Sequence, residues 1–211
     1  MVLILLGAPG SGKGTQADLI SKRFSLQVIS TGDILRAAIK AQTAPGLKAK
    51  EYVDEGKLVP DEIVAELLRQ RLEEPDCSGG YILDGFPRTI PQAELLETLG
   101  ISPEIALSIE VPDSDIEERM SGRRVCSCGA VFHQKYKPPK AEGICDKCAG
   151  SLIQRSDDTP ETVKARLRIY HEQSEPLKGF YERMGRLRTV VGTGGVEEIG
   201  KRVMEVLEGA V

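Results

Sequence analysis

The segment from Gly7 to Thr15 has the residue types and spacing that most clearly point to chemistry. It reads Gly-Ala-Pro-Gly-Ser-Gly-Lys-Gly-Thr and lies between an apolar run and a stretch of helical periodicity. Glycines let backbone N–H groups converge on phosphate oxygens, and the start of a helix adds its positive dipole end. The segment therefore predicts a nucleotide phosphate site, with Lys13 between the β- and γ-phosphates. The residues predicted to bind ATP here are Gly10, Ser11, Gly12, Lys13, Gly14 and Thr15.

One position departs from the general pattern of such loops. Gly14 follows the lysine where a serine or threonine usually stands, and Thr15 comes one residue later. The usual hydroxyl ligand of Mg²⁺ is therefore not in its expected place. Asp84 ends another apolar run, and its carboxylate could hold Mg²⁺ through water molecules instead. A buried capping aspartate is the alternative interpretation of Asp84.

Four of the five cysteines lie in one short segment, and they predict a structural Zn²⁺ site. They are Cys126, Cys128, Cys145 and Cys148. The second pair has the C-x-x-C spacing of a zinc knuckle, but the first pair is one residue shorter. A tight turn must then bring both thiolates to the ion, or nearby His133 replaces one of them. Four reduced thiols without a metal are the alternative, and a catalytic metal is disfavoured because four protein ligands leave no open position.

Alternating strands and helices must position these residues. Strands are predicted at 2–6, 27–29, 81–83, 105–111 and 189–191, and helices at about 15–24, after Asp61 as N-cap, after Thr159-Pro160 with a break near Pro176, and at 196–207. This alternation predicts an α/β fold, with a mainly parallel sheet between layers of helices. Two segments break the rhythm and are expected to leave the core. Residues 31–59 look helical throughout, and residues 122–158 are rich in Cys, Gly, Pro and Lys.

Length and composition favour one core with appendages. The chain has 211 residues, 40% hydrophobic and 28% charged, which is ordinary for a globular protein. A net charge of −4 argues against broad binding of nucleic acid or anionic membranes. The apolar start from Met1 to Leu6 lacks the basic region of a signal peptide, so a cytoplasmic location is expected. Arginines near glycines and segment ends could still clamp a compact polyanion locally.

Three motifs in order carry a resemblance to a known family. Gly14-Thr15-Gln16 completes the loop, Ser30 to Arg36 reads Ser-Thr-Gly-Asp-Ile-Leu-Arg, and Asp84 to Arg88 reads Asp-Gly-Phe-Pro-Arg. With the long cysteine-containing insertion, the chain closely resembles bacterial adenylate kinases of the type with a zinc-binding lid, through nearly its whole length. The resemblance implies a P-loop kinase core over 1–29, 60–121 and 159–211, an AMP-binding domain over 30–59 and a lid over 122–158. It also implies a monomer that transfers a phosphoryl group from ATP to AMP, with Mg²⁺, in nucleotide biosynthesis.

The resemblance also implies roles for single residues. Arg36 and Arg88 would grip the AMP phosphate, a task that suits the planar guanidinium. Further AMP contacts are implied for Thr31, Lys57, Leu58, Val59, Gly85, Phe86, Pro87, Gln92, Arg155 and Arg166. Gln92 would read the base through its amide. The catalytic set would be Lys13, Asp84, Arg88, Arg123, Arg155 and Arg166, and further ATP contacts would come from Arg119, Arg123, Val131, Phe132 and the backbone of Gly194. At Gly194 the family usually has a lysine.

Three other functions are compatible with parts of the sequence. Within the same enzyme class, the acceptor could be UMP, CMP or GMP, although the long lid and Gln92 favour AMP. From other classes, a zinc ribbon that binds nucleic acid or a nucleotide-gated switch could share the cysteines and the loop. The acidic net charge and the acceptor site of Arg36, Arg88 and Gln92 argue against both.

Overall fold

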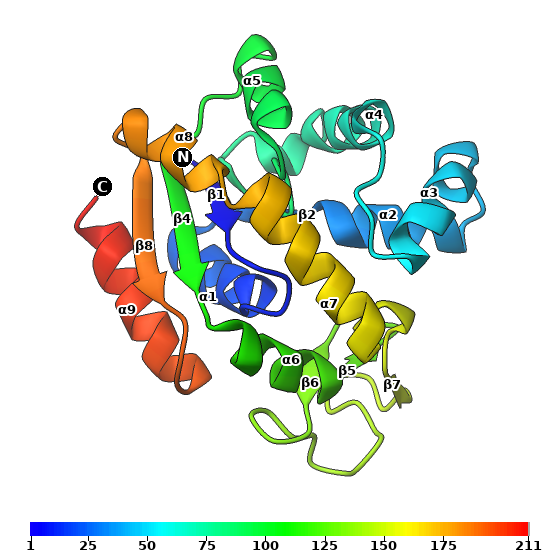
Figure 1. Ribbon diagram of the computed structural model, residues 1–211. Coiled ribbons are helices and arrows are strands. Elements are labelled where there is room, and N and C mark those ends of the chain that lie inside the picture. The colour runs from blue at the N-terminus through cyan, green and yellow to red at the C-terminus, as the bar shows by residue number, and fades with distance from the viewer. Residues whose placement is uncertain (211) are drawn as a thin grey trace.

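The central sheet of the computed structural model, which describes residues 1–210, is parallel throughout (Figure 1). Its strand order is β2-β3-β1-β4-β8. The bounds are β1 Val2–Leu6, β2 Gln27–Ser30, β3 Tyr81–Asp84, β4 Ile105–Glu110 and β8 Leu187–Val191. The strands lie where the apolar runs predicted them, within two residues at either end. The α/β fold with a parallel sheet is therefore confirmed.

Both faces of the sheet are covered by helices, as the continuous apolar character of β1 predicts. Leu3 and Leu5 of β1 share a buried cluster with residues of α1 (Lys13–Phe24) and α9 (Val196–Glu208). Ile4 and Leu6 point to the other face. They pack with residues of α4 (Asp61–Leu72), α5 (Ile90–Thr98) and α8 (Leu177–Arg183). The core is thus two apolar layers, one on each side of a buried sheet.

Because the strands are parallel, their carboxyl ends meet at one edge of the sheet, where ligands bind in open α/β folds. The loop from Gly7 to Gly12 follows β1, the motif from Ser30 to Arg36 begins at the last residue of β2, and the segment from Gly85 to Arg88 follows β3. Figure 1 shows the loop after β1 and the ends of β4 and β8 at the same side of the molecule. The three sequence motifs are therefore brought to one edge by topology alone.

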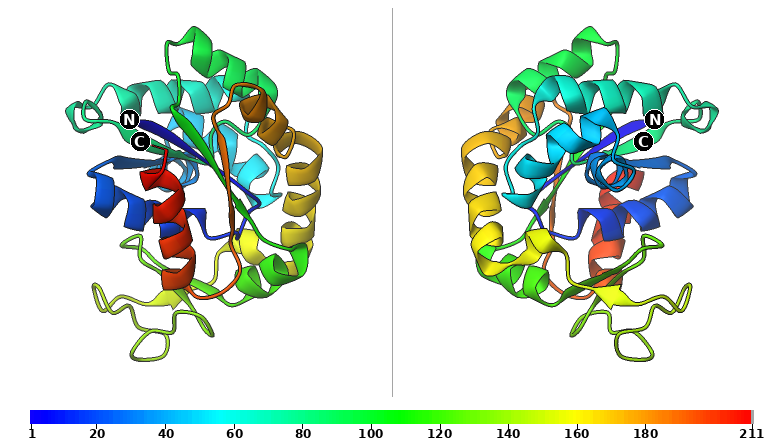
Figure 2. Two further views of the ribbon diagram at one scale, coloured as in Figure 1. Left: turned by 90° about the vertical axis from the view of Figure 1, so that its left-hand side faces the viewer. Right: turned by 90° about the vertical axis from the view of Figure 1, so that its right-hand side faces the viewer.

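The segment 122–158 leaves the central sheet and forms a small antiparallel sheet of order β6-β5-β7. Its strands are β5 Arg123–Cys126, β6 Val131–His133 and β7 Leu152–Ile153. It is entered from α6 (Asp113–Ser121) and left through a 3-10 turn, η2 (Ser156–Asp158), into α7 (Pro160–Ile169). Cys126, Phe132 and Cys145 are buried in a small cluster of their own. Figure 2 shows this segment at one end of the molecule, beyond α6 and α9.

The prediction of continuous helix over 31–59 was wrong. The segment contains α2 (Thr31–Lys40) and α3 (Ala44–Asp54), and no helix is found from Glu55 to Pro60. Gln42 lies between the two helices with a φ of 53°, and the Thr43 side chain caps α3 by accepting a hydrogen bond from the Gly46 N–H. A left-handed residue cannot continue a right-handed helix, so the chain reverses here. Helical periodicity on both sides of this turn had concealed it.

One predicted helix start needed correction, and one predicted helix break was confirmed. Pro60, not Asp61, is the N-cap of α4, and the Asp61 side chain bonds to Gln92 instead. The helix that starts at Thr159-Pro160 changes from α to π hydrogen bonding at Tyr170 and breaks just before Pro176, as predicted. It passes through a π-helical turn, η3 (Tyr170–Ser174), and α8 follows Pro176. A further 3-10 turn, η1 (Pro75–Cys77), precedes β3. Within residues 1–210, the helices are all too short or too polar to span a bilayer.

Candidate active site

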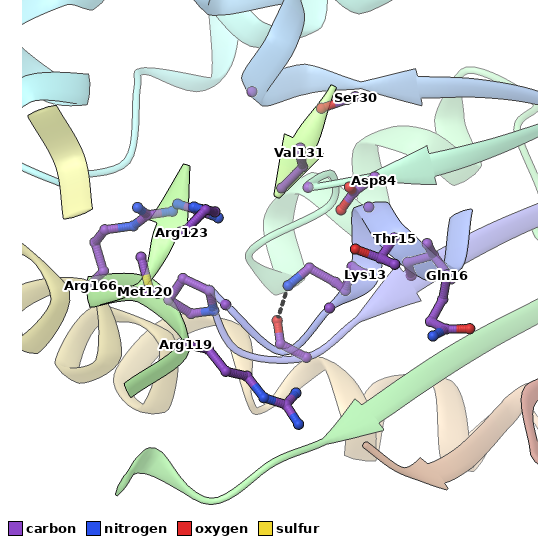
Figure 3. Close-up of a pocket in the computed structure, with 18 of the residues that line it drawn as sticks. Lys13, Thr15, Gln16, Ser30, Asp84, Arg119, Met120, Arg123, Val131 and Arg166 are labelled. Atoms are coloured by element: carbon purple, nitrogen blue, oxygen red, sulfur yellow. Dashed lines mark hydrogen bonds between the residues drawn. The ribbon is translucent and has the colours of Figure 1, made fainter. Parts of the chain in front are cut away.

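The loop after β1 has the backbone conformation that its glycines predict. Gly12 has a φ of 100° at the start of α1, a region that side chains other than glycine rarely adopt. A β-carbon at Gly7 would come within 2.6 Å of the Ile109 carbonyl oxygen. The Lys13 Nζ donates to the Gly7 and Ala8 carbonyls at 2.6 and 2.8 Å, and Figure 3 shows the side chain turned back over the loop. Burial lowers the pKa of Lys13 to about 8, against the raising effect of Asp84. A bound polyphosphate would supply the negative charge that this buried ammonium lacks.

A cavity of about 380 Å³ opens beside this loop. It is lined by nearly all residues predicted to bind ATP: Gly10, Gly12, Lys13, Gly14, Thr15, Arg119, Arg123, Val131, Phe132 and Gly194. Ser11 is the exception, because its side chain is buried behind the loop and its Oγ has no hydrogen-bond partner within the described residues. Loop, small sheet and the turn after β8 therefore enclose one common space.

Asp84 lines the same cavity at the end of β3. Figure 3 shows its carboxylate next to the first turn of α1, where Lys13 and Thr15 lie. Burial raises the pKa of Asp84, and the charges of Lys13 and Arg88 oppose that shift. Within residues 1–210, its carboxylate oxygens accept no hydrogen bond, so their lone pairs remain open to a hydrated cation. This arrangement favours a binding carboxylate over a cap.

A second, smaller cavity of about 60 Å³ adjoins the first. The predicted AMP residues that line it are Thr31, Arg36, Lys57, Leu58, Val59, Gly85, Phe86, Arg88, Gln92 and Arg166. Pro87 and Arg155, also predicted for AMP, line the larger cavity instead. Arg36, Arg88 and Arg166 line both cavities. Three guanidinium groups therefore lie at the junction, where two phosphate chains could meet.

Two acidic residues that the sequence analysis missed hold two of the arginines of the larger cavity. Asp158, which is fully buried, accepts two hydrogen bonds from Arg123, and Asp157 accepts from Arg166 Nη1 at 2.7 Å. Burial, together with the nearby charge of Arg123, lowers the pKa of Arg155 to about 10. An excess of positive charge thus persists after the two ion pairs form. The one sign of these ion pairs in the sequence was the two consecutive aspartates just before the helix that starts at Thr159.

The smaller cavity is shaped by a hydrogen-bonded group around Gln92, whose side chain is 2% exposed. Its Oε1 accepts from the Arg88 backbone N–H at 2.6 Å, and its Nε2 donates to Asp61 Oδ1 at 2.6 Å. The Arg88 guanidinium is turned by a bond from its Nε to the Gly85 carbonyl at 2.8 Å. The loop between them contains a cis peptide bond before Pro87. The sequence analysis named Gln92 and Arg88 as site residues but did not predict that Asp61 accepts a hydrogen bond from Gln92.

At the other end of the larger cavity, Arg119 lies between the loop and the small sheet. Its Nη2 donates to the Gly192 carbonyl at 2.8 Å, and its guanidinium lies 6.0 Å from the Tyr136 ring centre. His133 and Tyr136 also line this end, with ring centres 4.6 Å apart. A cation and two aromatic rings make a surface on which a flat base could stack. Tyr136 had not been predicted from the sequence, where it lies in a polar, lysine-rich stretch.

The four cysteines of the segment 122–158 converge. Their sulfur atoms all lie within 4.8 Å of one another, and the Cys126–Cys148 and Cys128–Cys145 Sγ pairs are 3.4 and 3.7 Å apart. Tetrahedral Zn²⁺ with sulfur at about 2.3 Å has its ligands about 3.8 Å apart, which these spacings match. The required tight turn is present, because the Gly129 N–H donates to the Cys126 carbonyl. His133 lies outside this cluster, and its Nδ1 accepts from the Lys135 and Tyr136 N–H groups.

Together, the loop with Lys13, the two adjoining cavities and the arginines at their junction define a P-loop enzyme that transfers phosphoryl groups between nucleotides. The family model described as adenylate kinase matches residues 5–186. Similar curated proteins named adenylate kinase come from Caldicellulosiruptor saccharolyticus, 57% identical over 98% of this chain and 99% of its own length, and from Acetivibrio thermocellus, 54% identical over 99% of both. A third, from Carboxydothermus hydrogenoformans, is 52% identical over 99% of this chain and 100% of its own length. The chain belongs to the adenylate kinase family.

Proposed function

We propose that the larger cavity binds ATP and the smaller one AMP, so that this transferase carries out the adenylate kinase reaction, in which ATP and AMP give two ADP reversibly. The observation that carries the proposal is the junction of the two cavities. Arg36, Arg88 and Arg166 line both, and Lys13 lies on the ATP side only. A donor and an acceptor phosphate can therefore approach each other among fixed positive charges.

The chain's own residues would work by alignment and charge neutralisation. An oxygen of the AMP phosphate attacks the γ-phosphorus of ATP in line, and ADP leaves on the opposite side. Lys13, Arg123, Arg155 and Arg166 would stabilise the charge on the transferring group. Asp157 and Asp158 fix the Arg166 and Arg123 guanidinium groups through ion pairs. No side chain needs to act as a nucleophile.

Acceptor binding is assigned to groups at the smaller cavity. Arg36 and Arg88 would take the AMP phosphate, with Thr31, the backbone from Lys57 to Val59 and Gly85 around the nucleoside. The Arg36 Nη2 is bonded to Asp33 at 2.6 Å, which keeps it near the cavity mouth. Gln92 would read the base. On the donor side, Arg119 would stack on the adenine of ATP, with Val131, Phe132 and Gly194 beside it.

Two metals fit residues of the chain. Adenylate kinases use Mg²⁺ with ATP, where it neutralises phosphate charge, and the Asp84 carboxylate would hold it here through water. Cys126, Cys128, Cys145 and Cys148 would hold one structural Zn²⁺, which their mutual spacing supports. Zn²⁺ in this position would fold the small sheet rather than take part in transfer.

The division into moving parts follows from the same assignment. Residues 122–158 would form a lid that closes over ATP and excludes water, and residues 30–59 would form the AMP-binding part, both attached to a core of 1–29, 60–121 and 159–211. The separate buried cluster of the segment 122–158 supports its motion as a unit. A monomeric state and a cytoplasmic location remain predictions from the sequence.

The test is a coupled assay with ATP as donor and AMP, CMP, UMP or GMP as acceptor. We expect clear turnover with AMP and much lower kcat/KM with the other three. A preference for CMP, UMP or GMP would overturn the acceptor assignment. Absence of turnover with all four, in protein that is folded and binds ATP, would instead leave a nucleotide-binding switch.

A further inference from the structure

The carboxylate of Asp61 lies against the amide of Gln92, the group proposed above to read the base of AMP. Asp61 Oδ1 accepts a hydrogen bond from Gln92 Nε2, and Gln92 Oε1 accepts one from the Arg88 backbone N–H, both at 2.6 Å. The start of α4 here meets a stretch 31 residues further along the chain, where the loop after β3 leads directly into α5. Gln92 is buried and lines the smaller cavity. Asp61 does not line it, so it can act only through Gln92.

These two partners determine which way round the amide lies. An ionised carboxylate only accepts hydrogen bonds, so it must face the NH₂ group, and a backbone N–H only donates, so it must face the carbonyl oxygen. Turning the amide by 180° would place oxygen against carboxylate and NH₂ against N–H. Both contacts, which are partly buried, would then be lost and replaced by repulsion. The orientation is therefore fixed from two sides.

The fixed amide has one bond left to make at each end. One N–H of Nε2 and one lone pair of Oε1 remain after the two internal bonds. The edge of adenine far from the sugar offers a ring nitrogen that accepts, beside an amino group that donates, and this order is complementary to the amide. Guanine and other 6-oxo purines offer the reverse order, an N–H beside a carbonyl. They could pair only with the turned amide.

We propose that Asp61 is a positioning residue that sets base specificity. It holds the Gln92 amide in the orientation that accepts a 6-amino purine monophosphate and rejects a 6-oxo purine monophosphate. The inference rests on the proposed function, since it requires that Gln92 reads the acceptor base. It assigns to Asp61 a role in substrate choice rather than in capping α4, whose N-cap is Pro60.

Asp61→Asn tests the inference, because an asparagine amide has the same size but can face either end of Gln92. The turned orientation then loses only the Arg88 contact. We expect the ratio of kcat/KM for AMP to that for GMP to fall about tenfold, with the KM for ATP unchanged. Glu62→Gln removes the same charge from the same turn of α4 at an exposed position, and it should leave the ratio unchanged. An unchanged ratio in Asp61→Asn would overturn the proposal, as would an equal fall in Glu62→Gln.

Gln92→Leu separates this inference from the assignment on which it rests. If Gln92→Leu leaves the AMP to GMP ratio unchanged, Gln92 does not read the base, and the acceptor assignment fails together with the role of Asp61. If Gln92→Leu lowers the ratio and Asp61→Asn does not, only the role of Asp61 fails. The double variant should match Gln92→Leu alone, because Asp61 acts through Gln92. An additional fall in the double variant would mean that Asp61 acts independently, which contradicts the proposal.

Discussion

The two cavities are assembled in different ways. The phosphate groups of ATP would meet one continuous segment, Gly7 to Thr15, whose shape is set by its own backbone and by the helix that it starts. The smaller cavity draws its polar groups from α2, the segment 57–59, the loop after β3, Gln92 and, behind it, Asp61. A continuous site depends on local conformation and an assembled site on tertiary packing. The first can be read from a motif, whereas the second needs the fold.

Replacing Lys13 by methionine tests the continuous site and should have the largest effect. The change removes the one ammonium group of the loop but keeps a long apolar stem, and we expect kcat to fall at least about a hundredfold. Thermal stability should not fall, because burial already disfavours the charged form of Lys13 and lowers its pKa to about 8. Steady-state kinetics and a thermal melt would check both parts. Lys22→Met is the matched control, because Lys22 is exposed near the end of α1, the helix that Lys13 begins. Near-normal turnover in Lys13→Met would contradict the assignment of the loop to phosphate binding.

Replacing Arg88 by alanine tests the assembled site. The guanidinium is proposed to bind the AMP phosphate, and a charge-assisted contact of this kind corresponds to roughly 10- to 100-fold in kcat/KM for AMP. The affinity for ATP, measured by titration, should change by less than about twofold, because ATP phosphates are held by the loop. Arg36→Ala should show the same selectivity with a smaller loss, since Arg36 is already paired with Asp33. Equal weakening of both nucleotides would show that the two cavities do not divide the substrates.

The same difference explains how far the sequence could be interpreted. The strands, the loop and the helix that starts at Thr159 follow from short-range patterns, and the structure confirms them. Asp61 looked like a helix cap because it stands between a proline and an apolar periodicity, but its partner is 31 residues away. Asp157 and Asp158 escaped notice for the same reason, because their ion pairs with Arg166 and Arg123 depend on how the segment 122–158 folds back. Resemblance to a family supplied roles for Gln92 and the arginines that no local pattern could have given.

The cysteine cluster combines features of the continuous site and the assembled site. Each cysteine pair lies in a short stretch of sequence, but the two pairs come together only through folding of the segment 122–158. Removal of Zn²⁺ by a chelator, or Cys148→Ser, should lower Tm by about 5–15 °C, since metal binding and folding of the small sheet are coupled. The phosphate loop lies outside that sheet, so ATP should still bind. Elemental analysis should find one zinc per chain in the unmodified protein. Cys77→Ser is the matched control, because Cys77 is buried elsewhere, bonded to Arg71, and its loss should leave the zinc content unchanged.

The alternative with His133 as fourth ligand is tested by the same measurement. The structure brings Cys126 and Cys128 together and leaves His133 outside the cluster, so zinc should be lost or weakened in Cys126→Ser and retained in His133→Ala. The reverse result would assign the fourth position to the histidine.

The smallest expected effect concerns the two histidines, His171 and His133, because their surroundings shift the two pKa values in opposite directions. His171, in the π-helical turn, bonds through Nδ1 to Glu175 at 2.9 Å and through Nε2 to Asp113 of α6 at 3.0 Å. Both ring nitrogens can donate only in the imidazolium form, so these two carboxylates raise the pKa of His171. Burial, in contrast, lowers the pKa of His133.

The sign of each contribution to stability follows from linkage. His171 stabilises the fold fully below the pKa of about 6.5 that it has when unfolded, and this contribution is lost as pH rises through its higher folded pKa. His171→Gln should therefore lower Tm by roughly 1–3 °C at pH 5.5 and by nothing measurable at pH 9, since the site is partly exposed and screened. For His133 the charged form is disfavoured in the folded state, so its unfavourable contribution grows as pH falls below about 6.5. Melting curves of His171→Gln and His133→Ala across this pH range should diverge from that of the unmodified protein in opposite directions. A pH-independent difference for His171→Gln would show that its ion pairs add nothing to stability.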